Sequence, residues 1–132
     1  MKILNFKVFL VGLVCSFLTA CSFGVKQEDL IGRWNYVSYE YTNKSLDKPL
    51  ANIAVQQPYI QFDENGACKI VSSGKVISEG KYHLENKIIR YTETLTNGQK
   101  RSIPFLINSL SKKELVFQTM DAEVKVITAV KE

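Results

Sequence analysis

The chain has 132 residues, and its 17 Lys and Arg against 13 Asp and Glu give a formal net charge of +4. This length allows one domain and not two. The longest basic runs are the pairs Lys100-Arg101 and Lys112-Lys113. Because proteins that follow a phosphate backbone concentrate positive charge on one face, this dispersed charge argues against nucleic-acid binding.

The N-terminal segment has the features of a secretory signal peptide. Lys2 and Lys7 precede an apolar run of 11 residues from Val8 to Leu18, broken only by Gly12 and Ser16. A basic head, a short apolar segment and small residues before a cleavage point are typical of such signals. The run is too short for a transmembrane helix, which needs about 20 apolar residues.

The segment Leu18-Thr19-Ala20-Cys21 follows this run and resembles the lipobox of bacterial lipoproteins. The resemblance implies cleavage before Cys21, lipid on its thiol and attachment to the membrane of the bacterial cell envelope. Ser22 is not the aspartate that retains enteric lipoproteins in the inner membrane, which favours the outer membrane. We therefore expect a signal peptide over 1–20, a tether over 21–28 and one domain over 29–132.

The cysteines predict a domain without disulfides. Cys15 would leave with the signal peptide and Cys21 would carry the lipid that the resemblance implies, so we expect Cys68 to have no partner within the chain. Cys68 and Ile70 share one face of an expected strand, opposite Lys69. Free cysteine is among the most buried residue types, which favours an inert core thiol over a reactive or intermolecular one.

From Asp29 onward the pattern is that of β-strands joined by short turns. The turns contain Asn65-Gly66, Ser73-Gly74, Glu85-Asn86, Asn97-Gly98 and Asp121-Ala122. They separate eight expected strands, at 34–41, 59–62, 67–72, 75–84, 87–95, 101–107, 114–119 and 124–130.

Consecutive antiparallel strands of this kind bury one face by closing into a barrel or by folding over into a sandwich. Closure leaves no edge strand, which matters in a β-rich chain without disulfides. The sequence therefore predicts an all-β fold, an eight-stranded up-and-down antiparallel barrel.

Four short motifs resemble lipocalins and the lipocalin-like domains of bacterial lipoproteins. They are Gly32-Arg33-Trp34, Phe62-Asp63-Glu64-Asn65-Gly66, Glu79-Gly80-Lys81-Tyr82 and Leu115-Val116-Phe117. The resemblance implies a lipocalin-like barrel in which a basic side chain, here Lys125 or Lys131, lies over the tryptophan. Gly32 would let the backbone turn steeply into the first strand, and Trp34 would close one barrel end.

One connection, Thr42 to Pro58, is much longer than the others and has apolar residues of its own: Leu46, Leu50, Ile53 and Val55. Such a segment is a functional lid or a connector that covers a barrel end for stability. Because Trp34 would close the end where the chain enters the barrel, we expect this connection at the other end, with its apolar residues facing the mouth.

The sequence does not contain a recognisable set of catalytic residues. His83 is the only histidine, and one histidine with one free cysteine is too few ligands for zinc. No glycine-rich phosphate loop follows a strand. We therefore expect no enzyme activity, cofactor or metal.

Binding remains as the expected function. The residues predicted to point inward are Trp34, Tyr36, Ile60, Phe62, Ile70, Tyr82, Leu84, Ile103, Phe105, Leu115, Phe117, Val124 and Val126, with Tyr39, Tyr41 and Tyr91 outside. A barrel of eight strands is filled by its own side chains or holds one small ligand.

The first hypothesis is a monomer that binds a small apolar ligand through Tyr36, Leu46, Leu50, Ile53, Phe62 and Tyr82. The alternative is a filled barrel that binds an envelope protein, as an inhibitor or as an assembly or sensing adaptor. Exposed tyrosines, which favour interfaces, support the second hypothesis.

Overall fold

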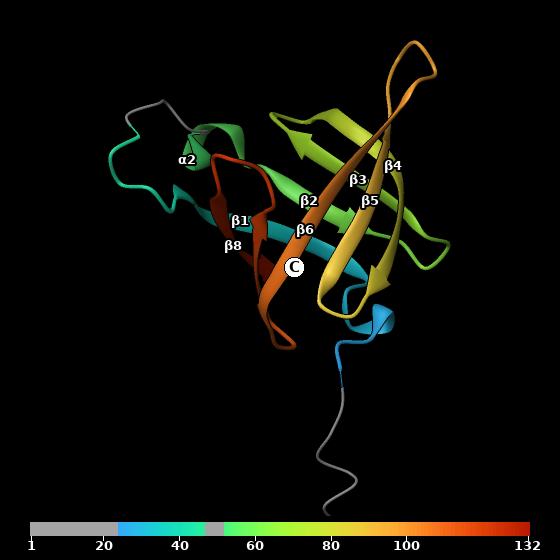
Figure 1. Cartoon of the computed structure of the whole chain (residues 1–132), viewed down its shortest axis with the longest axis horizontal. Helices are drawn as coiled ribbons and strands as arrows, with labels where there is room; N and C mark the ends of the chain where they lie inside the picture. Colours follow the sequence, from blue (N-terminus) through green and yellow to red (C-terminus); the bar gives the residue numbers. More distant parts are fainter. Residues whose placement is uncertain (1–23, 47–51) are drawn as a thin grey trace, which may run out of the picture.

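The computed structural model describes residues 24–46 and 52–132, which form a closed antiparallel barrel (Figure 1). A 3-10 turn, η1 (Gln27–Asp29), precedes the first strand, and one short helix, α2 (Ile53–Gln56), lies between the first two strands. The strands are β1 (Gly32–Tyr41), β2 (Tyr59–Phe62), β3 (Ala67–Ser72), β4 (Lys75–Glu85), β5 (Ile88–Thr94), β6 (Lys100–Leu110), β7 (Glu114–Thr119) and β8 (Lys125–Lys131).

Each strand pairs with its neighbours in the chain, and β8 returns to pair with β1 along most of its length. The predicted eight-stranded up-and-down barrel is thus confirmed. All of its strands lie between Gly32 and Lys131, and the core residues that the structure describes lie between Val25 and Ala129. No described helix is long and apolar enough to cross a membrane.

The tight turns follow from their sequences. Ser73 and Gly74, between β3 and β4, have φ angles of 53° and 74°. Two successive residues with positive φ form the turn whose twist matches that of the flanking strands. Asn86 (φ 56°) serves the β4–β5 turn, since asparagine tolerates this conformation better than most residues.

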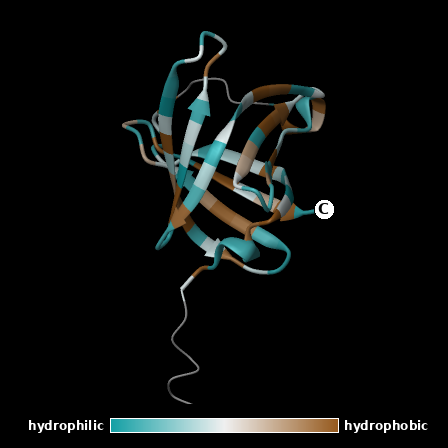
Figure 2. Cartoon of the chain, turned by 90° about the vertical axis from the view of Figure 1, so that its right-hand side faces the viewer, coloured by the Kyte–Doolittle hydropathy of each residue, from teal (hydrophilic) through white to brown (hydrophobic). Residues whose placement is uncertain are grey.

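The core lies inside the barrel, where every second residue of a strand points. Hydrophobic and hydrophilic residues alternate along the strands in Figure 2. The largest side chains with almost no exposed surface are Trp34, Tyr91, Phe62, Phe117, Leu30, Ile60, Ile89, Leu115 and Ile127.

The two ends of the barrel differ, and we call them the closed end and the open end. The closed end carries Leu30 and the 62–67, 85–88 and 110–114 turns; η1 marks it at the lower right of Figure 1. The open end carries the long 42–58 connection and the 72–75, 94–100 and 119–125 turns. The expectation that the long connection leaves β1 at the end opposite Trp34 is therefore correct.

Trp34 seals the closed end. Its ring is fully buried, and its indole Nε1 donates a hydrogen bond to the Leu30 carbonyl oxygen at 2.8 Å. The Lys131 ammonium lies 5.3 Å from the centre of a Trp34 ring, so of the two candidate lysines Lys131 covers the tryptophan. Gly32 has a φ of 132°, and a Cβ atom there would lie 2.8 Å from Lys131 Cε.

Two predictions about strand faces are wrong because of a bulge in β1. The register against β8 shifts between Tyr36 and Ser38. A bulge inserts one extra residue into its strand. The insertion moves Tyr39 and Tyr41 from the expected outer face to the inner one, where they pair with Ile127 and Lys125. Tyr39 packs against the core.

Two further face assignments are corrected on other strands. Tyr91 was expected outside and is fully buried, on the same face of β5 as Ile89. On β8 the inward residues are Ile127 and Ala129 instead of Val124 and Val126. The apolar residues of β8 occur on both faces, so alternation alone did not decide between them.

Candidate functional site: a cavity at the open end

A cavity of about 730 Å³ opens at the end of the barrel opposite Trp34. It is framed by β1, β3 to β8 and the residues just before β2. Its lining residues are Tyr36, Tyr39, Tyr41, Gln56, Pro58, Ile70, Ser72, Ile77, Ser78, Glu93, Arg101, Ile103, Phe105, Thr119, Lys125 and Ile127. Ligand sites in proteins typically have this size and combine apolar walls with a few polar groups.

Aromatic side chains form one wall and the floor of the cavity. The Tyr36 and Tyr39 rings are stacked with centroids 6.4 Å apart, and Tyr36 meets Phe117 edge to face at 6.1 Å. Below them Phe105 contacts Phe117 edge to face at 5.3 Å. Burial, and then the neighbouring Tyr39, raise the pKa of Tyr36, so its hydroxyl stays neutral at physiological pH.

The opposite wall holds a buried carboxylate. Only 7% of the Glu93 side chain is exposed, and its Oε1 accepts a hydrogen bond from Arg101 at 2.7 Å. Ser78 Oγ donates to Oε2, and Tyr91 and Ser78 share a hydrogen bond of 2.7 Å. Burial raises the pKa of Tyr91 to about 12, although the bond to Ser78 lowers it. Tyr91, Ser78, Glu93 and Arg101 thus form a continuous chain of polar contacts, which we call the Glu93 network.

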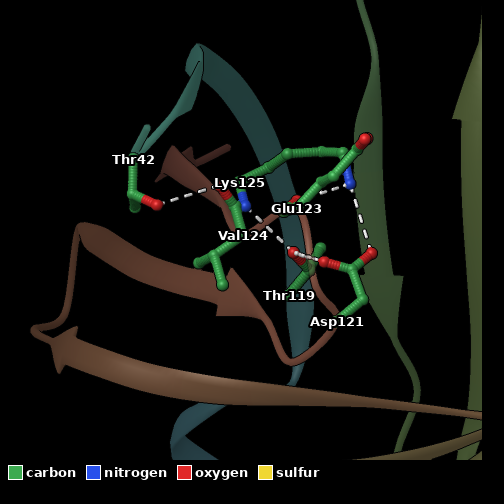
Figure 3. A network of polar contacts seen from close by, with 6 residues as sticks. All are labelled: Thr42, Thr119, Asp121, Glu123, Val124 and Lys125. Atoms are coloured by element: carbon green, nitrogen blue, oxygen red, sulfur yellow. Dashed lines mark hydrogen bonds and ion pairs between the residues drawn. The ribbon is translucent and has the colours of Figure 1, made fainter. Parts of the chain in front are cut away.

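The rim beside β8 is fixed by a second set of polar contacts, drawn in Figure 3. The Lys125 ammonium donates to Asp121 Oδ2 at 3.2 Å and to the Glu123 carbonyl at 2.9 Å, and it lies 5.8 Å from the centre of the Tyr41 ring. Thr119 Oγ1 donates to Asp121 Oδ1 at 3.0 Å. The slight burial of Asp121 raises its pKa, but the bonds from Thr119 and Lys125 outweigh this and leave the pKa below its usual value. The positive charge of Lys125 is therefore already satisfied by the protein.

The rim contacts also hold the start of the long connection. The backbone N–H of Thr42 donates to the Val124 carbonyl at 3.0 Å, and its hydroxyl donates to the same oxygen at 3.3 Å (Figure 3). At its other end the connection is tied to the β3–β4 turn, where Ser73 N–H donates to the Gln56 carbonyl at 2.7 Å.

Of the predicted ligand-binding residues that the structure describes, only Tyr36 lines this cavity. Phe62 and Tyr82 lie in the closed half, where their rings are 4.9 Å apart and the Tyr82 hydroxyl donates to the Asp63 carbonyl. Leu46 is half-buried and does not reach the cavity. Leu50 lies outside the described residues.

The two apolar side chains of helix α2 that were expected to face the mouth, Ile53 and Val55, lie away from the cavity. Ile53 faces a separate hollow of about 780 Å³ on the outside of the barrel, between α2, β1 and the β3–β4 turn. Val55 is 75% exposed and lines the same outer hollow instead of the mouth. Only Gln56 and Pro58 from this part of the connection reach the cavity.

The Glu93 network was missed because the face of β5 was assigned wrongly. Once Tyr91 points inward, alternation places Glu93 beside it, and the register places Arg101 directly across from Glu93 on β6. A glutamate in a strand predicts an outward-facing position, yet a charge near a barrel mouth can be buried when it is paired. The sequence signal that could have revealed the network is the pair of opposite charges, Glu93 and Arg101, on either side of the Asn97-Gly98 turn.

The other polar candidates from the sequence are Cys68 and His83. Cys68 is buried, and burial raises the pKa of its thiol to about 12, so it remains protonated and inert. His83 is exposed, 4.0 Å from Glu85. Within residues 24–46 and 52–132, no three His, Cys, Asp or Glu side chains are placed to hold a metal ion.

No known family model matches the chain, and neither does any curated protein.

Proposed function

We propose that this protein is a membrane-anchored, lipocalin-like lipoprotein of the bacterial envelope, and that it binds a small apolar ligand in the open end of its barrel. One observation carries the binding proposal: the cavity of about 730 Å³, with an aromatic wall and a few polar groups on the facing side. The lipobox-like segment Leu18-Thr19-Ala20-Cys21 supports the anchor and its place in the envelope.

Filling the cavity should weaken ligand binding. Ile103 lines the cavity from β6, whereas its neighbour Ser102 is exposed on the outer face of the same strand. In a form that begins at Ser22, Ile103→Trp should weaken binding of the uncharged dye N-phenyl-1-naphthylamine at least about tenfold, which is about 1.4 kcal/mol. The Ser102→Trp variant is the matched control and should bind like the wild type. Dye fluorescence titrations measure both. A wild-type protein that does not bind the dye, or equal binding by both variants, would contradict the proposal.

Lipid attachment is tested at Cys21. Cys21→Ser should leave an uncleaved precursor without lipid, since the thiol is the proposed acceptor. One acyl chain holds a protein at a membrane only marginally, and two or more give stable anchoring. Mass spectrometry of the wild-type protein should find lipid on an N-terminal Cys21. An unmodified N-terminus at another residue would remove the basis for the anchor.

A second candidate function, binding of an envelope protein, is favoured by the rim of the open end. Large apolar side chains are exposed there on two segments: Ile77 (63%) and Val76 (50%) at the start of β4, and Met120 (47%) just after β7. Exposed apolar groups that cluster can mark an interaction site. Affinity purification of the native lipoprotein separates the candidates: a stoichiometric protein partner favours this function, and an extractable small molecule favours the first.

A further inference from the structure

The cavity lining contains charges of both signs, and these groups differ in how many of their polar atoms are already bonded. Its charged lining residues are Glu93, Arg101 and Lys125. The carboxylate is nearly buried and both of its oxygens are engaged, by Ser78 and by Arg101. The Lys125 ammonium is held by Asp121 and a backbone carbonyl.

Arg101 is the exception among these groups. Its side chain is 62% exposed, and among the described residues its one polar contact is the bond from a terminal nitrogen to Glu93. A guanidinium carries five N–H donors in a planar fork, and that fork matches the geometry of carboxylates and phosphates. Arg101 therefore has donors left over at the edge of an apolar cavity.

Glu93 fixes where those donors lie. It sits directly across from Arg101 in the β5–β6 register and is itself held by Ser78, which is tied to Tyr91. An arginine held by a buried partner loses less side-chain freedom when it binds a ligand, because part of that entropy is already lost. Glu93 is thus a positioning residue for Arg101.

We infer that Arg101 determines which head group the ligand carries, an inference that rests on the proposed ligand-binding function. The ligands are anionic amphiphiles. Their apolar part packs against Tyr36, Tyr39 and Phe105, and their anionic head binds the Arg101 guanidinium. Lys100 provides a matched control. It precedes Arg101 and carries the same charge, but it pairs with Thr94 and is exposed on the opposite face of β6.

The experiment compares dodecanoate with dodecanol, which share a chain length and differ in the charge of the head. Both displace N-phenyl-1-naphthylamine from the form beginning at Ser22, at pH 8, and the ratio of their affinities is the readout. The wild type should prefer the acid. Arg101→Gln should reduce that preference about tenfold and leave dodecanol binding within about twofold, since bonds to a charged group contribute about this much. Lys100→Gln should keep the wild-type preference.

Arg101→Gln leaves Glu93 buried with only Ser78, so the variant could lose stability for that reason alone. The double variant Glu93→Gln/Arg101→Gln removes both charges together and keeps groups that can bond to each other and to Ser78. It should also lose the preference for the acid. A double variant that keeps the wild-type ratio, an equal loss in Lys100→Gln, or a wild type without preference would each overturn the role of Arg101. If neither dodecanoate nor dodecanol displaces the dye, the proposed ligand binding fails, and this inference with it.

Discussion

Trp34→Ala is expected to lower the free energy of unfolding by about 3–5 kcal/mol, the range for truncating a buried aromatic residue. The ring is fully buried at the closed end, and its loss would open a cavity under Lys131. It would also leave the Leu30 carbonyl, now bonded to the indole N–H, without that donor. Small domains are stable by only about 5–15 kcal/mol in total, so much of this variant should be unfolded or insoluble.

Urea denaturation followed by circular dichroism measures the effect of Trp34→Ala. Val37→Ala, on the same strand at a side chain that is 52% exposed, is the control and should shift the midpoint little. Trp34→Phe should fall between the two, because it keeps most of the apolar contact but not the hydrogen bond. An unchanged midpoint for Trp34→Ala would show that the closed end does not depend on this ring.

Gly80→Ala should lower the free energy of unfolding as much as Trp34→Ala, for a different reason. A Cβ atom at Gly80 would lie 1.9 Å from the Thr92 carbonyl oxygen and 3.0 Å from Glu93 Cα. These are backbone atoms of β5, which cannot move away as the end of a side chain can. Strands β4 and β5 would have to separate, at a cost above the typical 1–3 kcal/mol of overpacking. Because Gly80 is paired with Glu93, the Glu93 network would be displaced too.

Soluble yield and the urea midpoint report on Gly80→Ala. Gly24→Ala is its control, since a Cβ atom there meets nothing within 4 Å and its backbone conformation is ordinary. The control should behave like the wild type. If Gly80→Ala matched it, β4 and β5 would have to be farther apart than the structure places them.

The order and approximate extent of the strands could be read from the sequence because local signals decide them. Turn residues such as Asn97-Gly98 mark where strands end, and alternation marks their extent. Consecutive strands with short turns leave few ways to bury one face, and the need to avoid edge strands favoured closure into a barrel over a sandwich. The single long connection, at 42–58, is also plain in the sequence.

The cavity could not be read in the same way, because it depends on which face of each strand points inward. A bulge after Tyr36 reverses the faces of Tyr39 and Tyr41, and nothing in the local sequence specifies that extra residue. On β5, a hydrophobic pattern predicts that glutamate lies outside. Glu93 points inward because Ser78 and Arg101, on two other strands, hold its oxygens. Long-range pairs of this kind become visible only once the register is known.

The chain joins the barrel at the end opposite the cavity. Val25 packs against the core, and Gly24 and Val25 lie beside Leu110 and Lys131 at the closed end. With lipid on Cys21, as proposed, only about 10 Å of chain separates the anchor from Gly24. The closed end would then face the bilayer, and the mouth would stand roughly 25 Å farther out, given strands of this length and tilt. A guest could not slide into the mouth from the leaflet that holds the anchor. It would have to cross water, be handed over by a carrier, or come from an apposed membrane.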